Sequence, residues 1–404
     1  MRFGFPRPPA AGPTVLVTDA HERAAVATCR GLLAAGYAVA AAASSRLAPA
    51  QWSRACRERL VLPDPLADGE RYAEALAEIV AARPYDLLIP GSDQALLAIS
   101  ARRELFDPHT RTGLPRPEVV TRSLDKGELG AVASAVGLDA PTTVTCHDVS
   151  EALDAARRLG YPVLIKAERV VHRVGRATRR QASVRVEHPD DLARLVPLYG
   201  APFLLQRCQP GTLVSYAGVR SREGLRARAA ARYVRTWRPD FGMATFSTSI
   251  APPQELMDRA DRLLEAFAWE GIFQIQLIAG DDGSFAAIDL NPRPYGSMAL
   301  ALRAGVNIPG IWARTVLSGG SAEVVEARPG INYRWEDGDL RHLLWQLRRG
   351  RPNEAFRVLR PHRRVAHAYF KIDDPLPLLA RVAAGRLRVK HEASSRGQRF
   401  QTRT

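Results

Sequence analysis

Cysteine and long apolar runs are scarce in this 404-residue chain. The four cysteines are widely spaced, form no CxxC pair and have no histidine at ligand spacing: Cys29, Cys56, Cys146 and Cys208. This spacing argues against a zinc site or a disulfide framework and favours free thiols. The longest apolar stretches, such as residues 38–43, are far shorter than the roughly 20 residues that a membrane-spanning helix needs. Residues 1–13 contain four prolines and no apolar signal core, so we expect a flexible leader and a cytoplasmic protein.

Lysine is the scarcest charged residue. Only four lysines occur among the 57 Lys and Arg side chains, against 42 Asp and Glu, and the net charge is +15. Residues 331–404 carry 17 Lys and Arg against 7 Asp and Glu, so this segment holds most of the excess. The charge predicts either a solvated basic surface or contact with an anionic polymer or membrane, and it does not decide between them.

The first part of the chain has the pattern of a parallel sheet. Three apolar runs of strand type alternate with two helical segments, at 14–20, 21–35, 37–43, 68–83 and 85–90. Strand, helix and strand at this spacing predict an α/β unit with right-handed crossovers. Ligands of such sheets bind at the carboxyl ends of the strands, which makes His21 and Asp93 candidate substrate residues. No GxGxxG follows the first strand, so we predict no dinucleotide site.

A proline-marked linker at 108–117 separates this unit from the rest. The later segments predict helices mixed with mostly antiparallel strands, so the fold class is α/β at first and α+β in the second half. A helix is expected from Ser123, as its N-cap, to residue 136, and basic helices at 340–347 and 378–389. The predicted organisation is a leader (1–13), an α/β domain (14–118), a small lobe (119–200), a large lobe (201–330) and a basic helical extension (331–404).

A hairpin predicted at 273–278 and 285–290 carries the most informative polar residues. If its turn is centred on residues 282–283, Gln276 lies opposite Asp289, with Asn291 on the same face as Asp289. Arg293 follows closely. Carboxylate and amide oxygens suit Mg²⁺, which also binds nucleotide phosphates. The hairpin therefore predicts a magnesium site.

These motifs resemble the ATP-grasp superfamily. Asp289-Leu290-Asn291-Pro292-Arg293, followed by Gly296-Ser297 and residues 305–309, is similar to the terminal signature of its carboxylate–amine ligases, a branch related to the carbamoyl-phosphate synthase large subunit. Asp125-Lys126, residues 161–166 and residues 203–211 resemble its two lysine segments and its adenine hinge, in family order. The resemblance implies a Rossmann-like pre-ATP-grasp domain followed by a two-lobed ATP-grasp fold, over roughly residues 14–318.

The resemblance also implies the roles of single residues. It assigns ATP to Lys126, Lys166, Gln206, Arg207 and Cys208; Mg²⁺, with Mn²⁺ as an alternative, to Gln276, Asp289 and Asn291; catalysis to Arg293, Arg232 and Arg235; and substrate contact to His21, Asp93 and Ser297. The implied reaction uses ATP to convert a carboxylate to an acyl phosphate, which an amine then attacks to form an amide. The partners are small-molecule substrates, and a homodimer is one assembly that the family shows.

Three departures from the family pattern keep other hypotheses open. The expected glycine-rich lid at 167–181 carries five arginines instead, at 169, 173, 176, 179 and 180. Gln276 stands where an acidic metal ligand is usual, and Arg207 where the hinge usually has an acid. A degenerate nucleotide-binding protein without ligase turnover is therefore the alternative. A basic protein that binds nucleic acid or an anionic membrane surface is the third hypothesis.

Overall fold

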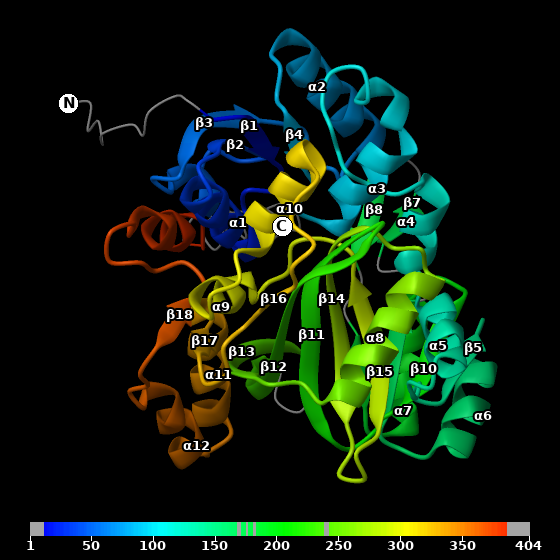
Figure 1. The fold of residues 1–404 in the computed structure, drawn as a ribbon. Coiled ribbons are helices and arrows are strands. Elements are labelled where there is room, and N and C mark those ends of the chain that lie inside the picture. Colours follow the sequence, from blue (N-terminus) through cyan, green and yellow to red (C-terminus); the bar gives the residue numbers. More distant parts are fainter. Residues whose placement is uncertain (1–11, 168–170, 175–176, 181–182, 238–241, 386–404) are drawn as a thin grey trace, which may run out of the picture.

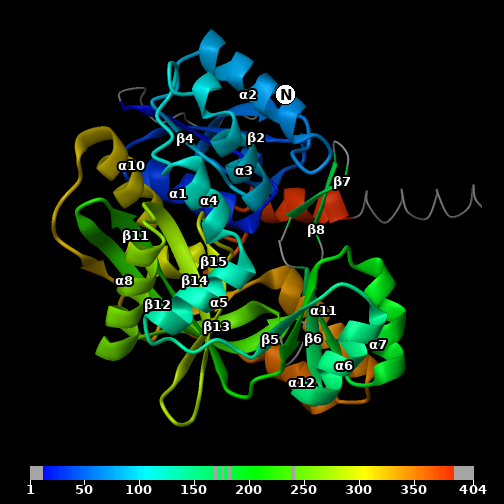
Figure 2. The same cartoon turned by 90° about the vertical axis from the view of Figure 1, so that its right-hand side faces the viewer.

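The computed structural model describes residues 12–167, 171–174, 177–180, 183–237 and 242–385. Figure 1 shows an N-terminal domain above a small lobe and a large lobe, and Figure 2 shows the two lobes separated by a gap in the ribbon below that domain. In this described part of the chain, no helix is long and apolar enough to cross a membrane. All four cysteines are free, as predicted.

The N-terminal domain is a parallel sheet with the strand order β3-β2-β1-β4. Its elements are β1 (Thr14–Val17), α1 (Arg23–Ala34), β2 (Ala38–Ala43), β3 (Cys56–Val61), α2 (Gly69–Ala82), β4 (Leu87–Ile89) and α3 (Asp93–Ala101). The predicted strands at 14–20, 37–43 and 85–90 are confirmed, whereas β3 was not predicted. Its sequence, CRERLV, has three charged residues in a row and lacks the continuous apolar run that marks a buried parallel strand.

A parallel sheet must be covered on both faces, and this one recruits helices from far along the chain. Helices α2 and α3 cover one face. On the other face α1 packs with α9 (Met298–Arg303) and α10 (Ile308–Ser318) in one apolar cluster. The helices approach closely, because a Cβ on Gly31 of α1 would lie 2.7 Å from the Asn307 side chain, whose Nδ2 donates to the Gly31 carbonyl.

Two short helices lead into the small lobe, α4 (Pro117–Ser123) and α5 (Lys126–Ala135). The prediction of Ser123 as an N-cap was wrong: it ends α4, and its hydroxyl donates to the Val119 carbonyl. Asp125 caps α5 instead, accepting from the backbone N–H groups of Gly127 and Glu128. A carboxylate accepts such bonds and also favours the positive end of the helix dipole. Lys126 therefore begins a helix.

The small lobe is a sheet with the order β5-β10-β6-β9, backed on one face by α6 and α7. Its elements are β5 (Thr143–Cys146), α6 (Val149–Leu159), β6 (Val163–Ala167), β9 (Val184–Val186), α7 (Pro189–Leu195) and β10 (Phe203–Arg207). A hairpin of β7 (Val171–Val174) and β8 (Ala177–Arg180) leaves this sheet and extends on the side of the N-terminal domain (Figure 2).

The large lobe is built on a long sheet with the order β15-β14-β11-β12-β13-β17-β18, with β16 beside β12. Its elements are β11 (Thr212–Ser221), β12 (Gly224–Trp237), β13 (Met243–Ile250), α8 (Gln254–Ala266), β14 (Gly271–Ala279), β15 (Phe285–Asn291), β16 (Val325–Glu326), β17 (Asn332–Arg334), α11 (Glu336–Arg348), α12 (Pro352–Phe356) and β18 (Val365–His367). The C-terminal segment is thus not simply helical: β17 and β18 extend this sheet, and a last helix runs over 376–385.

Asp374, which precedes this last helix, fastens the C-terminal segment to the N-terminal domain. Its carboxylate accepts hydrogen bonds from Arg30 Nε (2.9 Å), the Ser53 hydroxyl (2.6 Å) and the Arg54 backbone N–H (2.9 Å). The residue is 3% exposed. A buried carboxylate with several donors holds its partners in place, and removing it leaves a mostly buried guanidinium without its counter-charge.

Replacement of Asp374 by alanine is expected to lower the free energy of unfolding by about 3 kcal/mol, because Arg30 then lacks its counter-charge. Urea denaturation followed by tryptophan fluorescence measures this change. Asp373→Ala is the matched control, since the side chain of Asp373 is 41% exposed and pairs at the surface. The control should cost less than about 1 kcal/mol. Equal small losses in both variants would contradict the role of Asp374.

Candidate active site

The hairpin of β14 and β15 has the predicted register. Gln276 pairs with Asp289 and Gln274 pairs with Asn291. Asn291 Nδ2 lies 3.4 Å from both Asp289 Oδ2 and Gln274 Oε1. The side chain of Gln276 hydrogen-bonds to Tyr233 on β12, and burial raises the pKa of that tyrosine to about 12. The hairpin therefore brings one carboxylate and several amides to one end of the sheet.

The two predicted phosphate lysines line one cavity of about 370 Å³ between the small lobe, α5 and β15. Alternation along the strands explains the lining. Lys166 on β6 pairs with Leu204 on β10, and both face the cavity, whereas their neighbours Ile165 and Leu205 pack against the helices behind. Lys126 reaches the same cavity from the first turn of α5. Two of the four lysines of the chain thus converge on one site.

Lys166 is buried, and its Nζ donates to Gln206 Oε1 at 2.6 Å. Burial, together with the nearby ammonium of Lys126, lowers the pKa of Lys166 to about 7, although the Asp289 carboxylate acts in the opposite direction. Burial disfavours an ammonium because the charged form loses its hydration. The contribution of Asp289 to this pKa also links the lysine cavity with the hairpin of β14 and β15.

The predicted hinge residues have different roles. Gln206 is buried and bridges Lys166 to Thr143, because its Nε2 donates to the Thr143 hydroxyl at 2.9 Å. Arg207 turns away: its side chain is exposed and donates to the Leu159 carbonyl. Its backbone N–H is also engaged, with the Thr142 carbonyl. The backbone groups of Cys208, the next residue, are therefore the candidate contacts for the edge of a nucleobase.

Arg293 joins the hairpin to the N-terminal domain. Its guanidinium donates to both carboxylate oxygens of Asp93, at 2.6 and 3.0 Å, and to Asn291 Oδ1 at 3.1 Å. Asp93 begins α3 at the carboxyl end of β4, and both side chains are nearly buried. The paired Asp93 raises the pKa of Arg293 despite burial, so the guanidinium stays charged. The structure brings these two predicted residues together, although 200 positions separate them.

The remaining predicted residues differ in their surroundings. Arg235 makes a bidentate pair with Asp339 of α11, at 2.8 and 2.7 Å, and Arg232 is exposed. Ser297 is buried and lies 3.4 Å from Gln274 Nε2. His21 follows β1 and is 39% exposed. Their predicted roles in catalysis or substrate contact stay predictions.

Two further polar residues of the site were not predicted. Tyr233 lies next to Arg232 on β12, and strand alternation would have assigned it to the inner face with Gln276. Asp19 ends the first strand with a φ of 52°, accepts from the Thr18 hydroxyl at 2.6 Å and is 4% exposed. Burial raises the pKa of its carboxyl. The strand-end rule that selected His21 would also have found Asp19.

Two regions contribute little to the described site. Of the arginine-rich lid, Arg169 and Arg176 lie outside the described residues, and Arg173, Arg179 and Arg180 are placed only by the backbone of β7 and β8.

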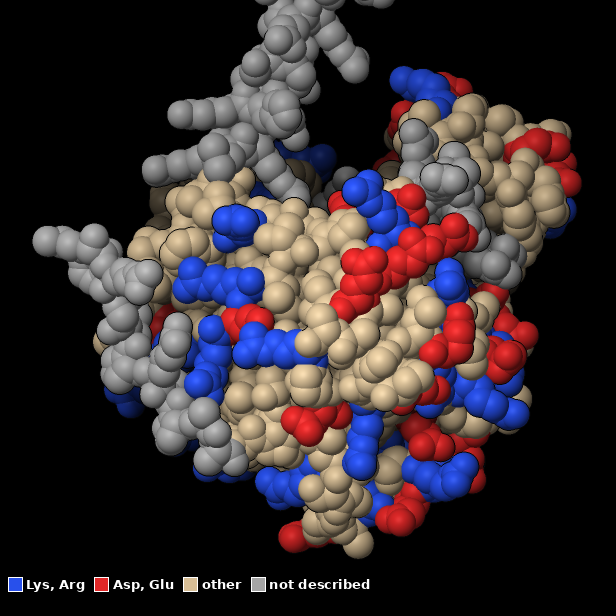
Figure 3. Space-filling view, turned by 90° about the horizontal axis from the view of Figure 1, so that it is seen from above, with Lys and Arg blue, Asp and Glu red and all other residues tan. Residues whose placement is uncertain are grey.

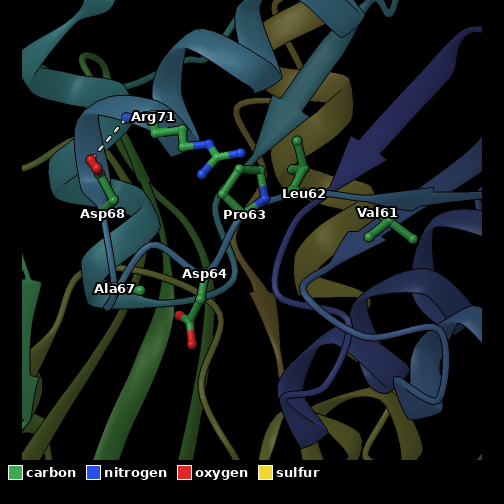
Figure 4. A pocket seen from close by; sticks show the side chains of 7 residues that line it. All are labelled: Val61, Leu62, Pro63, Asp64, Ala67, Asp68 and Arg71. Atoms are coloured by element: carbon green, nitrogen blue, oxygen red, sulfur yellow. Dashed lines mark hydrogen bonds between the residues drawn. The ribbon is translucent and has the colours of Figure 1, made fainter.

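A second pocket, of about 460 Å³, opens between the end of β3 and the start of α2 (Figure 4). Asp68 accepts from the Arg71 N–H at its rim, and none of the predicted site residues lines it.

Comparison with known proteins agrees with this architecture. Residues 233–338 match the family described as ATP-grasp in the biosynthetic pathway with Ter operon. The matched segment runs from the end of β12 through the hairpin of β14 and β15 into α11. No curated protein matches the chain.

Solved structures with similar folds cover most of the chain. An N5-carboxyaminoimidazole ribonucleotide synthetase in complex with ADP is 14% identical, with a TM-score of 0.61 over 81% of this chain and 82% of the other. The L-amino acid ligase from Bacillus licheniformis is 14% identical, with a TM-score of 0.58 over 77% and 75%. The biotin carboxylase of Campylobacter jejuni, as a complex with ATP, is 15% identical, with a TM-score of 0.59 over 77% and 72%.

The fold, the two lysines that face one cavity and the hairpin of β14 and β15 agree with the ATP-grasp family that residues 233–338 match. The resemblance to the ATP-grasp superfamily is thereby confirmed, as is the predicted order of a parallel α/β domain followed by the two lobes.

The pKa of Lys166 predicts how nucleotide affinity depends on pH. A polyphosphate beside Lys166 favours the ammonium form and therefore raises the pKa of Lys166 above its value of about 7 in the free protein. At any pH between these two pKa values, binding of the nucleotide is accompanied by uptake of a proton. Affinity for ATP should therefore be highest below pH 7 and fall above it, by up to about tenfold per pH unit.

Calorimetry at about pH 8, in buffers of different ionisation enthalpy, should show an uptake approaching one proton per nucleotide. Lys166→Arg should abolish this uptake, because a guanidinium stays charged. Lys371→Arg, at an exposed lysine of the C-terminal segment, is the control. Binding without proton uptake in the unmodified protein would show that Lys166 does not titrate with the nucleotide.

Proposed function

We propose that this chain is an ATP-dependent ligase that joins a carboxylate to an amine through an acyl phosphate. The observation that carries the proposal is the convergence of Lys126 and Lys166 on one cavity between the two lobes, with the Asp289 carboxylate near enough to raise the pKa of Lys166 against the effect of burial. Two ammonium groups and an oxygen-rich hairpin suit a triphosphate with its metal ion. The similar solved structures, which include an L-amino acid ligase and an ADP complex of a synthetase, support the same reaction class.

The residues of the hairpin fit Mg²⁺. Within the described residues no three His, Cys, Asp or Glu side chains cluster as metal ligands, so the one carboxylate, Asp289, needs amide oxygens beside it. Gln276, which pairs with Asp289 in the register, and Asn291 carry the nearest amides. Asn291 directs its Nδ2 toward Asp289 and its Oδ1 toward Arg293, so its amide has to turn for the oxygen to reach an ion. Mg²⁺ accepts such a set because it keeps waters and phosphate oxygens as its other ligands. When bound, the ion neutralises negative charge on the β- and γ-phosphates.

The protein's own groups would then hold the reactants. The lysines bind the phosphates and orient the γ-phosphorus toward the substrate carboxylate. A carboxylate oxygen attacks this phosphorus and ADP leaves; the amine nitrogen then attacks the acyl carbon and phosphate leaves. Most N–H donors of Arg293 are already engaged, with Asp93, Asn291 and the Pro294 carbonyl. We therefore assign Arg293 the role of holding Asn291 in place against the N-terminal domain. In this proposal the second substrate enters at that domain.

A nucleotide-binding protein without turnover is the second candidate. The neutral side chain of Gln276 opposite Asp289 favours it, because one carboxylate holds Mg²⁺ less tightly than two. Phosphate release separates the two functions: a ligase releases phosphate only when both a carboxylate and an amine are present, whereas a sensor binds ATP and releases none.

The proposed site is tested by titrating Mg-ATP into the purified protein by calorimetry. Asp289→Asn should weaken binding at least about tenfold, because it removes the one carboxylate of the metal set. Lys166→Met should weaken it by a similar factor, through loss of the charge-assisted contact with phosphate.

Asp282→Asn is the matched control for Asp289→Asn. Asp282 lies in the turn of the same hairpin and is exposed, so its variant should bind like the unmodified protein. A folded protein that binds no ATP, with or without metal, rules out the ligase and the sensor alike. Tight binding without phosphate release across pairs of carboxylates and amines would favour the sensor.

A further inference from the structure

Helix α11 buries its polar side. Asp339, His342 and Gln346, at helical spacing, are 3%, 7% and 6% exposed. Asp339 accepts from Arg235 and lies 3.2 Å from Arg334 Nε. His342 Nδ1 lies 3.0 Å from the Thr236 carbonyl, which only accepts, so this nitrogen carries the proton and Nε2 can accept from the Gln346 amide. Most of the polar face is therefore paired against the large-lobe sheet, and the buried Gln346 Oε1 is left without a hydrogen-bond partner.

The opposite side of α11 is apolar and exposed. Leu340, Leu344 and Leu347, spaced to share one face, are 58%, 43% and 40% exposed. The adjoining α12 and the turn after it add Phe356 and Leu359, at 56% and 63%. This arrangement inverts the usual helix of a folded protein, whose apolar stripe faces the core. An apolar face of this extent marks a contact surface.

The same segment is strongly basic. Residues 340–364 contain eight arginines and one acidic residue, Glu354, which pairs with Arg357. Arg341, Arg348 and Arg351 are exposed. On the face seen from above in Figure 3, by contrast, positive and negative side chains are interspersed. In Figure 1 the pair α11–α12 lies across the page from α6 of the small lobe, and none of its residues lines the nucleotide cavity.

We propose that the exposed face of α11 and α12 docks on an anionic lipid surface, with the leucines in the interface and the arginines at the phosphate groups. Interfacial helices combine these features: an apolar face, a basic border and an aromatic residue, here Trp345, on whose ring Arg349 stacks at 4.2 Å. Anionic headgroups complement the eight arginines. The proposal is independent of the ligase function.

The charge and the side-chain types of this face disfavour two other binding partners, a second copy of the chain and a nucleic acid. A second copy of this chain would bring two equally basic faces together, and like charges repel. A nucleic acid would satisfy the arginines but not three leucines, because its surface offers phosphates, sugars and base edges. A lipid surface matches both components and needs no matching groove.

The test is cosedimentation of the full chain, without nucleotide, with vesicles of phosphatidylcholine containing about 30% phosphatidylglycerol at about 0.1 M salt. The protein should pellet with these vesicles and not with phosphatidylcholine alone. Leu340→Ser/Leu344→Ser/Leu347→Ser should lower the partition coefficient at least about tenfold, since it removes the inserted apolar surface. Arg341→Glu/Arg348→Glu/Arg351→Glu should lower it by at least a similar factor.

Matched controls change exposed residues elsewhere. Leu198→Ser replaces a leucine that is 66% exposed on the small lobe, and Arg46→Glu/Arg116→Glu/Arg222→Glu makes the same change in net charge at other exposed sites. Both should bind vesicles within about threefold of the unmodified protein. Asp289→Asn should also bind vesicles normally, which separates this result from the nucleotide site.

Three outcomes would overturn the proposal. The first is no binding of the unmodified protein to the anionic vesicles. The second is equal binding by the leucine variant, or equal loss in both arginine variants, which would show adsorption by charge alone. The third is binding to duplex DNA or RNA that needs Arg341, Arg348 and Arg351, without binding to vesicles, which would assign the surface to nucleic acid.

Discussion

The ion pair between Asp93 and Arg293 fixes the geometry on which the site depends. Asp93 stands at the carboxyl end of a parallel strand, and Arg293 follows the hairpin that carries Asp289 and Asn291. With two short hydrogen bonds and little exposure, the pair fixes the distance between the two domains at this point. The proposed ligation requires that a carboxylate and an amine be held together, and this contact would keep the hairpin and the N-terminal domain in a fixed relation for it.

The sequence predicted features that depend on local patterns. Apolar runs indicated the strands, and the position of the turn predicted the pairing of Gln276 with Asp289. It did not predict partners that only the tertiary fold brings together. The family resemblance suggested a catalytic role for Arg235, which stays a prediction; its ion pair with Asp339, over 100 positions later, was not predicted. Strand β3 and the outward leucines of α11 were missed because their patterns contradict the usual rule for burial.

The cavity offers a physical reason why its two basic residues are lysines in a chain where lysine is scarce. Arginine serves nearly every other basic position, yet Lys126 and Lys166 face one enclosed space. Two guanidinium groups there would both remain charged and repel each other in the empty site. A buried ammonium can instead lose its proton, as the lowered pKa of Lys166 indicates, and regain it when phosphates arrive. The free protein thus has less repulsion between the buried Lys166 and the half-buried Lys126.

The apolar cluster that α1 shares with α9 and α10 has a consequence for synthesis on the ribosome. The strands of the N-terminal sheet emerge early, but two of the helices that cover one of its faces are translated only after the small lobe and most of the large-lobe sheet. Until then only α1 covers this face, and the rest of it is open to wrong partners. Its second strand is AVAAAA, and small alanine side chains expose less apolar surface than branched ones. The nascent chain should therefore have only a mild tendency to aggregate before α9 and α10 complete this face.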